Sequence, residues 1–298
     1  MYNKQNPRVP MSQFKRRFLK LPLLSIALLG MYSSYAQSDW KASVGGQMSF
    51  AELRADQSTL NTSTDPGAGF NLGISYGLNE SWSLHSGIGI SYIETSNNSS
   101  NYSDQAAATD FEGENFEFRY RLENYSERQK STMLSIPVGV QYESKGSQTR
   151  FYSKAGASVN VFLSPKVEGR ANRLTTSGYF ERFNAVLTAP AFAGFGTFDE
   201  IQFSENDLDI KNSFNAFLEI GVKEKFGSNN WVYIGLFAEY GLNDLLENNN
   251  SNLIEYNQNT PTDFINNSSL NSTIGNAPLF DKVTLNMVGL RVKYEFGI

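Results

Sequence analysis

Residues 82–92 read WSLHSGIGISY, and the alternation in this stretch decides the fold. Trp82, Ile88 and Tyr92 belong to an apolar phase that only Ser86 interrupts, and the residues between them are polar or glycine. A period of two is typical of a β-strand with one apolar face. At about 3.3 Å per residue and roughly 40° of tilt, Trp82 and Tyr92 lie about 25 Å apart along a membrane normal, which is the height of the apolar band of an outer-membrane barrel. The stretch therefore predicts a lipid-facing strand with an aromatic ring at each membrane interface.

Eight stretches share this alternation, and they are longer than the roughly five or six residues of a usual soluble strand. They span residues 40–52, 68–78, 81–94, 131–143, 150–163, 213–226, 231–243 and 283–298. The links between them alternate between short and long, as in an up-and-down barrel with short periplasmic turns and long extracellular loops. The four long connections span, in chain order, about residues 53–67, 95–130, 164–212 and 244–282. The sequence therefore predicts an all-β fold, an eight-stranded antiparallel transmembrane β-barrel with both termini on the periplasmic side. A soluble sandwich with its apolar faces turned inward is the alternative.

Residues 1–36 have the pattern of a secretory signal peptide, which leaves residues 37–298 as the barrel domain. A basic region without acidic residues precedes an apolar run over residues 21–32, which is short for a membrane span. Ser34 and Ala36 supply small residues at the −3 and −1 positions, so we expect cleavage before Gln37. Met11 is an alternative start, and an uncleaved anchor helix is the alternative to cleavage. An exported, acidic chain without cysteine indicates a bacterial envelope.

The composition excludes several functional classes. The 298 residues contain no cysteine and one histidine, which excludes a disulfide scaffold, a thiolate site and a metal site with several histidines. The net charge of −5 argues against a nucleic-acid partner. The sequence has no phosphate-binding loop or nucleotide fingerprint, and the acids within residues 199–209 lack the spacing of a calcium loop. We expect no cofactor, no metal site and no nucleic-acid partner.

The polar phase of the strands places charged residues inside the barrel, where an eight-stranded lumen is just wide enough for side chains. Buried charges need partners, so we expect ion pairs that plug the lumen, with Glu239 as a partner for Arg291 and Lys293. The predicted luminal charge network is Lys41, His85, Glu143, Lys154, Glu219, Lys223, Glu239, Arg291, Lys293 and Glu295. The predicted membrane-interface aromatics are Trp82, Tyr92, Tyr142, Tyr240, Tyr294 and Phe296.

An alternative hypothesis is that the chain is an enzyme that uses Ser83 and His85. They share a strand face at a spacing of about 6–7 Å, and a Ser–His pair serves acyl transfer in barrels of the lipid A deacylase type. Both residues face the lumen rather than the lipid, and no acidic residue lies nearby in sequence to orient the histidine. We therefore expect no catalytic site and place His85 in a luminal hydrogen-bond network. A small porin is a third alternative, which a plugged lumen disfavours.

The long connections carry distinct patterns. Residues 115–122 read NFEFRYRL and alternate, which predicts a strand extension or hairpin above the membrane. Residues 248–250 and 266–269 are rich in asparagine and serine, which indicates solvated segments. The third connection holds an aromatic patch, which we interpret as a folded cap over the barrel mouth, with a ligand-binding surface as the alternative. The patch consists of Tyr179, Phe180, Phe183, Phe192, Phe195, Phe198 and Phe203.

Residues 134–142 read LSIPVGVQY and resemble a strand motif of the Bacteroidetes PorT-like, or outer membrane protein β-barrel domain, family. The sequences KAGA at 154–157, FAEYGLND at 237–244 and GLRVKYEF at 289–296 also fit, so the resemblance covers about all of residues 38–298. It implies a small barrel that is a non-enzymatic scaffold for surface loops, with a role in envelope integrity, surface binding or protein secretion. The expected partners are outer-membrane lipids, the barrel assembly machinery and an extracellular ligand or secretion partner.

Pro137, within the motif, conflicts with the rule that proline avoids interior strands, because it has no N–H to donate to the ladder. A closed barrel has no edge strand on which to place it. We expect a local bulge at Pro137, or a position where the missing N–H removes no ladder bond.

Overall fold

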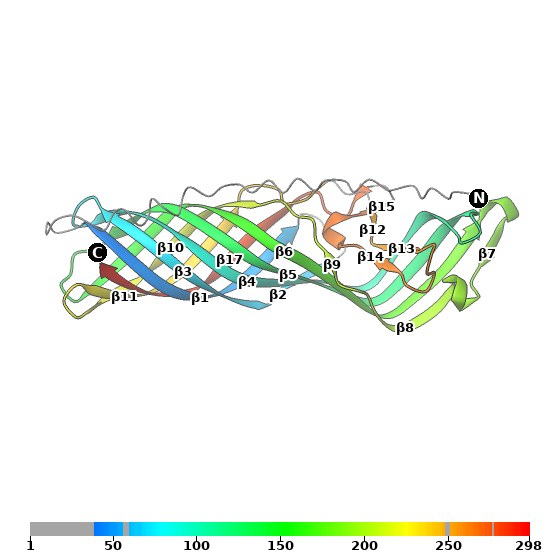
Figure 1. The fold of residues 1–298 in the computed structure, drawn as a ribbon, viewed down its shortest axis with the longest axis horizontal. Coiled ribbons are helices and arrows are strands. Elements are labelled where there is room, and N and C mark those ends of the chain that lie inside the picture. Colours follow the sequence, from blue (N-terminus) through cyan, green and yellow to red (C-terminus); the bar gives the residue numbers. More distant parts are fainter. Residues whose placement is uncertain (1–38, 56–59, 248–250, 276) are drawn as a thin grey trace, which may run out of the picture. The chain divides into compact units, whose positions relative to one another are not determined.

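Eight long antiparallel strands close into a ring in the computed structural model, which describes residues 39–55, 60–247, 251–275 and 277–298 (Figure 1). The strands are β1 (Trp40–Ala55), β3 (Pro66–Gly77), β4 (Trp82–Thr109), β5 (Asn115–Glu143), β6 (Thr149–Phe180), β10 (Ser213–Phe226), β11 (Asn230–Gly241) and β17 (Val283–Gly297). Their hydrogen-bonded order is β10–β11–β17–β1–β3–β4–β5–β6, and β6 pairs back with β10. The predicted fold class is confirmed. The predicted signal peptide, residues 1–36, lies outside the described residues.

Three short turns join strands at one end of the barrel, as the sequence predicted. They comprise residues 78–81 between β3 and β4, residues 144–148 between β5 and β6, and residues 227–229 between β10 and β11. The first turn shows how local sequence sets its shape, because the Asn79 side-chain oxygen accepts hydrogen bonds from the backbone N–H groups of Ser81 and Trp82. We call this end of the barrel the short-turn end.

The outer surface of the barrel is apolar and the inner surface is polar. Ile88, Val138 and Leu290 are 57%, 63% and 43% exposed, so the apolar phase of each strand points outward. Aromatic rings pair across neighbouring strands at the short-turn end, where Trp82 lies 5.1 Å from Tyr142 between ring centroids. Further outward rings occupy both ends of the barrel, at Trp40, Tyr76, Phe226, Tyr294 and Phe296 at the short-turn end and Phe50, Phe70, Tyr92, Phe214 and Tyr240 at the other. This inside-out arrangement is that of a lipid-facing barrel.

Pro137 lies at a gap in the β4–β5 ladder. The pairing of these strands runs through Ser86 opposite Val138 and resumes at Gly89 opposite Ser135, whereas Pro137 stays paired with Ser158 on β6. The Ser86 hydroxyl donates to the Pro137 carbonyl at 3.0 Å. The proline thus lies where the β4–β5 ladder is interrupted, and its missing N–H accounts for the gap. The same contact explains the single serine in the apolar phase of β4.

Strands β4, β5 and β6 continue far beyond the barrel, which the sequence predicted only for residues 115–122. The structure therefore corrects the expectation of long loops here: residues 95–109, 115–130 and 164–180 are strands, and residues 110–114 form the turn between β4 and β5. Shorter elements extend the sheet: β2 (Asn61–Thr64) pairs with β4, and β7 (Ala185–Leu187), β8 (Gly196–Gln202) and β9 (Asn206–Asp207) pair with β6. Two 3₁₀ turns, η1 (Glu181–Phe183) and η2 (Ala191–Ala193), flank β7. No helix in the described residues is long and apolar enough to cross a membrane.

The extended sheet bends where β5 reaches Asn124, and Figure 1 shows β5 and β6 changing direction before they meet β8. Asn124 has φ 51°, a left-handed conformation that asparagine tolerates better than most residues. Buried positions on β5 are odd-numbered below the bend, as at Tyr125, and even-numbered above it, as at Phe118. Both nonetheless contact the same segment, since Tyr125 bonds to Asn266 at 3.0 Å and the rings of Phe118 and Phe264 lie 6.0 Å apart. The bend therefore keeps one face of the sheet buried while changing the phase.

A hydrophobic core covers that face. Residues 251–275 and 277–280 pack on it, with Leu253, Ile254 and Leu270 at most 3% exposed. This segment contains β12 (Ser251–Asn252), β13 (Ile254–Glu255), β14 (Ile265–Asn266), η3 (Ser269–Asn271), β15 (Ser272–Ile274) and β16 (Ala277–Pro278). We call residues 95–130, 164–212, 251–275 and 277–280 together the distal module.

Candidate functional site

Glu219 on β10 is the centre of the ionic network inside the barrel. Its fully buried carboxylate lies 3.0 Å from the Lys154 ammonium, 2.9 Å from the Lys293 ammonium and 2.7 Å from the Arg291 guanidinium. The Tyr152 hydroxyl donates to the same carboxylate at 2.8 Å. Strand register creates the contact with Lys154, which lies directly opposite Glu219 in the β6–β10 ladder. Three cations around one anion leave positive charge that other acids must balance.

Arg291 connects this centre to Glu239. Its Nη2 lies 3.9 Å from Glu239, and its Nε and Nη2 donate to the Gln47 side-chain oxygen at 2.9 and 2.6 Å. The guanidinium also lies 4.3 Å from the centroid of the Phe237 ring, a cation–π distance. The predicted partner of Arg291 was Glu239, whereas its short ionic contact is with Glu219. The structure places Lys293 against Glu219 as well.

A second ionic cluster lies at the short-turn end. The Lys223 ammonium contacts the Glu143 carboxylate and donates to the Tyr233 hydroxyl at 3.0 Å. That hydroxyl donates to Glu295 at 2.9 Å, and Lys41 lies 3.6 Å from Glu295. Tyr233 therefore links the Glu143 and Glu295 ion pairs into one network. Since both acids and Lys223 are buried, removing one member leaves an uncompensated charge.

His85 lies on the luminal side, against Gly73 of the neighbouring strand. A Cβ atom on Gly73 would be only 3.0 Å from the imidazole Cε1, so the glycine makes room for the ring. A luminal cavity of about 40 Å³ adjoins His85, Lys154 and Arg291, with room for only a few water molecules. No side-chain hydrogen bond joins Ser83 to His85 in the described part of the chain. The structure therefore brings His85 to the ionic network and gives it no contact with Ser83.

Apolar side chains fill the lumen beyond the ionic network. These side chains belong to one hydrophobic cluster that continues into the distal module. All are at most 9% exposed: Ala51, Leu53, Ile93, Met133 and Phe162. The lumen is thus ionic toward the short-turn end and apolar toward the module. A hydrated ion would have to displace packed side chains in both parts to pass through.

The aromatic patch of the third connection divides into buried and exposed rings. Phe180 and Phe195 are buried against Phe116, with ring centroids 5.0 and 5.5 Å away. Phe183 and Phe192 are 63% and 73% exposed. The patch is therefore partly a folded core, but this core lies near the far end of β5 and β6. The interpretation as a cap over the barrel mouth is corrected, because the long strands carry these residues away from the mouth.

Glu127 on β5 anchors the fourth connection and was missed by the sequence analysis. Its fully buried carboxylate accepts hydrogen bonds from the Ser268 hydroxyl and the Ser269 N–H, both at 2.7 Å, from Gln129 at 2.6 Å and from Tyr125 at 3.0 Å. All four donor groups are uncharged. Burial raises the pKa of Glu127 above its usual value, although the four donors act in the opposite direction. Continuing the inward phase from Met133 would have found this residue.

Aromatic and basic partners of the luminal network were also missed. Tyr152 and Tyr233 lie on the inward phase and lie 5.0 Å apart between ring centroids. Arg150 lies 3.3 Å from Glu143 and 4.9 Å from the centroid of the Trp231 ring. All three residues share the inward phase of their strands, which the sequence shows. The two tyrosines were missed because only charged residues were considered, and Arg150 was missed although it is charged.

Comparison with known proteins gives one family and several distant structural likenesses. A family model described as outer membrane protein beta-barrel domain matches residues 35–247. No curated protein matches the chain. The crystal structure of Neisserial surface protein A is 10% identical with a TM-score of 0.36, over 86% of this chain and 97% of that one. Ail, the attachment invasion locus protein of Yersinia pestis, is 12% identical with a TM-score of 0.32, over 87% and 99%. OprG from Pseudomonas aeruginosa is 10% identical with a TM-score of 0.36, over 88% and 99%.

Proposed function

The chain belongs to the outer membrane protein beta-barrel domain family and lies in the bacterial outer membrane, and we propose that its barrel is a closed, non-enzymatic scaffold that presents the distal module for binding at the cell surface. One observation carries this proposal. The same three strands, β4, β5 and β6, form the barrel wall and then the central sheet of the module. Short turns are periplasmic in barrels of this kind, so the module extends outside the cell.

The contents of the lumen support a scaffold rather than a pore. Glu219 and Glu143 hold their cations in buried contacts, and Met133 and Phe162 belong to the apolar packing beyond them. Breaking a buried ion pair costs about 3–5 kcal/mol, so a conducting path would require several large losses at once. We assign no reaction to Ser83 and His85, because the imidazole lies against Gly73 within the ionic network.

Exposed apolar residues at the tip of the module support a binding role. Phe183, Val186, Leu187 and Phe192 are 63%, 50%, 41% and 73% exposed, and they lie on η1, β7 and η2. Water-exposed apolar residues gathered on one segment mark interaction sites. An accessory role in protein secretion, which the PorT-like resemblance implies, is the alternative that uses the same surface.

The test combines a binding assay with conductance recordings. Cells that display the full chain are compared with cells that display the Phe183→Ser/Phe192→Ser variant, on wells coated with extracellular glycoproteins and polysaccharides. We expect the double variant to attach less while still showing the heat-dependent gel shift of a folded barrel, and the purified barrel to show no discrete conductance in planar bilayers. Unchanged attachment or stepwise currents would contradict the proposal. Loss of exported proteins in cells carrying the variant would favour the secretion role.

A further inference from the structure

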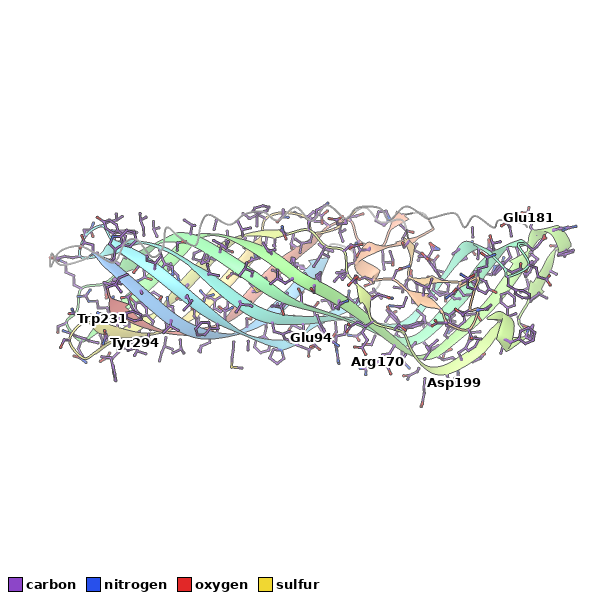
Figure 2. All side chains as sticks on the ribbon, in the orientation of Figure 1. Glu94, Arg170, Glu181, Asp199, Trp231 and Tyr294 are labelled. Carbon is purple, nitrogen blue, oxygen red and sulfur yellow. The ribbon has the colours of Figure 1, made fainter. Side chains whose placement is uncertain are left out.

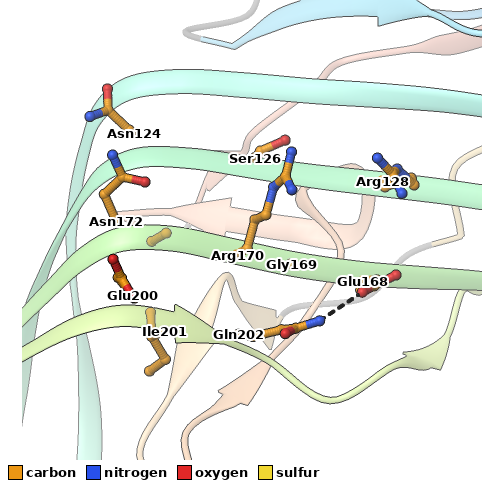
Figure 3. Close-up of a pocket in the computed structure, with 11 residues that line it drawn as sticks. Asn124, Ser126, Arg128, Glu168, Gly169, Arg170, Asn172, Glu200, Ile201 and Gln202 are labelled. Carbon is orange, nitrogen blue, oxygen red and sulfur yellow. Dashed lines mark hydrogen bonds between the residues drawn. The ribbon is translucent and has the colours of Figure 1, made fainter.

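A groove lies on the outward side of the sheet bend, between β5, β6 and β8 (Figure 3). Its volume is about 340 Å³, within the range of small-molecule sites. We call it the bend groove, and its charged and polar lining includes Asn124, Ser126, Arg128, Arg170, Asn172 and Glu200. It lies apart from the luminal network and from the exposed tip, so the inference below does not depend on the proposed function.

Strand register places the bend groove just above the membrane. Tyr92, at the outer aromatic belt, pairs with Thr132 on β5, and Arg128 and Ser126 lie four and six residues further along that strand. At about 3.3 Å per residue and roughly 40° of tilt, these positions are about 10 to 15 Å above the belt. Figure 2 labels Glu94 and Arg170 where the barrel wall continues into the distal sheet. The groove is thus above the aromatic belt, on the outward surface of the extended sheet.

Two arginines line the groove, and Arg170 has hydrogen-bond donors that no described residue accepts. The Arg170 side chain has no hydrogen-bond or ionic partner among the described residues, and Figure 3 shows its guanidinium pointing toward Ser126, with Arg128 further along β5. Arg128 contacts Glu94 through Nε at 2.9 Å. Two neighbouring guanidinium groups repel unless an anion lies between them, and their fork geometry suits the oxygens of a phosphate.

The carboxylates of the groove form no ion pair with Arg170 among the described residues. Glu168 is committed to the Lys130 ammonium at 2.8 Å and to the Gln202 amide at 3.1 Å. Glu200 lies at the other end of the groove, beside Asn172 and away from Arg170 (Figure 3). The groove therefore has a cationic end and an end of amide and carboxylate groups, which are the groups that hydrogen-bond sugar hydroxyls.

The bend also interrupts the strand pairing beside this second end. The β5–β6 ladder pairs Glu123 with Arg173 and Ser126 with Arg170, and omits the pairing of Asn124 between them. The β6–β8 ladder likewise passes over Asn172 and Glu200, and Glu200 has φ 51°. Backbone N–H and C=O groups left out of a ladder need other partners, and a polar ligand in the groove would supply them.

We propose that the bend groove binds a phosphorylated saccharide, with the phosphate on Arg128 and Arg170 and the sugar toward Asn124, Asn172 and Glu200. Two sources carry this chemistry: the head group of a phosphorylated glycolipid in the outer leaflet, or a soluble sugar phosphate. The position above the aromatic belt favours the glycolipid, which would fix the extended sheet against the membrane surface.

The experiment measures binding of defined probes to the full chain in detergent micelles. The probes are lipid A with both phosphates, lipid A with both phosphates removed, and glucose 1-phosphate as a competitor. The variants are Arg170→Gln, which breaks no existing contact, and Arg128→Gln/Arg170→Gln, with Arg182→Gln on the distant η1 as the matched change of charge. Heat-dependent gel mobility verifies that each variant is folded.

We expect the phosphorylated probe to bind at least tenfold more tightly than the dephosphorylated one. The change Arg170→Gln should weaken that binding by roughly tenfold, because hydrogen bonds to charged groups are about twice as strong as neutral ones, and Arg182→Gln should leave it unchanged. Displacement by glucose 1-phosphate at millimolar concentration would identify the soluble source, and no displacement would identify the glycolipid. Equal binding of both lipid probes, or wild-type binding by the folded double variant, would overturn the proposal.

Discussion

The two halves of β5 place apolar residues on opposite faces, because one half is surrounded by lipid and the other by water. In the barrel, the exposed side of β5 is apolar, as at Val138, and the buried side is ionic, as at Glu143. In the distal module, the buried side is apolar, as at Leu122, and the exposed side is charged, as at Arg121. The inversion follows the change from lipid to water outside the sheet, because apolar side chains avoid water and charges avoid lipid. Asn124, with its left-handed backbone, lies between the two patterns.

The largest expected effect belongs to the ionic core of the barrel. The change Glu219→Ala removes the carboxylate that Lys154, Arg291 and Lys293 share, and leaves the buried ammonium groups of Lys154 and Lys293 without their carboxylate partner. We expect a loss of at least about 3–5 kcal/mol in the free energy of unfolding, measured by urea titration of the reconstituted barrel. The matched change Glu224→Ala, at an exposed carboxylate at the short-turn end, should cost less than about 1 kcal/mol. Equal losses would show that Glu219 is not the centre of the network.

The second largest effect is expected in the apolar core of the module, where a substitution should destabilise the module but not the barrel. Leu122 is fully buried opposite Leu174, so Leu122→Ala leaves a cavity that costs about 2–5 kcal/mol. The expected readout is faster proteolysis of residues 95–130 with an unchanged gel shift of the barrel. The same substitution at Leu290, on the exposed face of the barrel, leaves no cavity and should affect proteolysis little. If Leu290→Ala opened the module as much as Leu122→Ala, the two regions would not be independent.

The inversion is tested directly by placing a charge on each exposed face. Ile88 is 57% exposed near the middle of its membrane segment. The change Ile88→Arg should lower the free energy of unfolding by about 2–4 kcal/mol, because the guanidinium would enter lipid. Val186 is 50% exposed at the tip of the module, so Val186→Arg should change the stability of the module by about zero. Equilibrium unfolding in lipid vesicles measures the first value, and module proteolysis measures the second. Tolerance of arginine at Ile88 would contradict a lipid-facing outer surface.

Much of the barrel could be predicted because lipid on one side and packed charges on the other impose a strict period of two. Glu219, Lys154 and Arg291 were assigned inward from phase alone. Their pairing could not be assigned, because it depends on register and on contacts across the lumen. Glu239 was the expected partner of Arg291, whereas Glu219 is the one that register and side-chain length bring within 2.7 Å.

The distal module was harder to predict for a different reason. Its strands change phase at the bend, so the alternation of residues 115–122 could not be connected with that of residues 131–143 as one continuous strand. The bend groove depends on that connection, whereas Glu127 lies below the bend and shares the phase of Met133. Glu127 is contacted by residues 268–269, which lie far away in the sequence. Segments rich in asparagine and serine have no periodic pattern, so the sequence does not reveal this packing.

The smallest predicted effect concerns the junction between the two regions, where residues 268–269 bond to Glu127. Burial raises the pKa of Glu127 in the folded chain above its value in the unfolded chain, so the folded state holds this proton to higher pH. The anchor is therefore strongest below the ordinary carboxyl pKa and weakens as the pH rises through the raised value. We expect amide hydrogen exchange in residues 264–272 to slow, after correction for intrinsic rates, as the pH falls from 8 toward 5.

The change Glu127→Gln supplies the control for this pH dependence. It keeps one acceptor oxygen, toward the Ser269 N–H, and turns its amide NH2 toward the Ser268 hydroxyl, which can accept. The amide cannot titrate, so the pH dependence in residues 264–272 should flatten. Tyr125 is the other titratable group in contact with this carboxyl, and burial also raises its pKa, so it stays neutral throughout the range. Protection that weakened on acidification would mean that the four donors outweigh burial at Glu127, and that the charged carboxylate holds the fourth connection on the sheet.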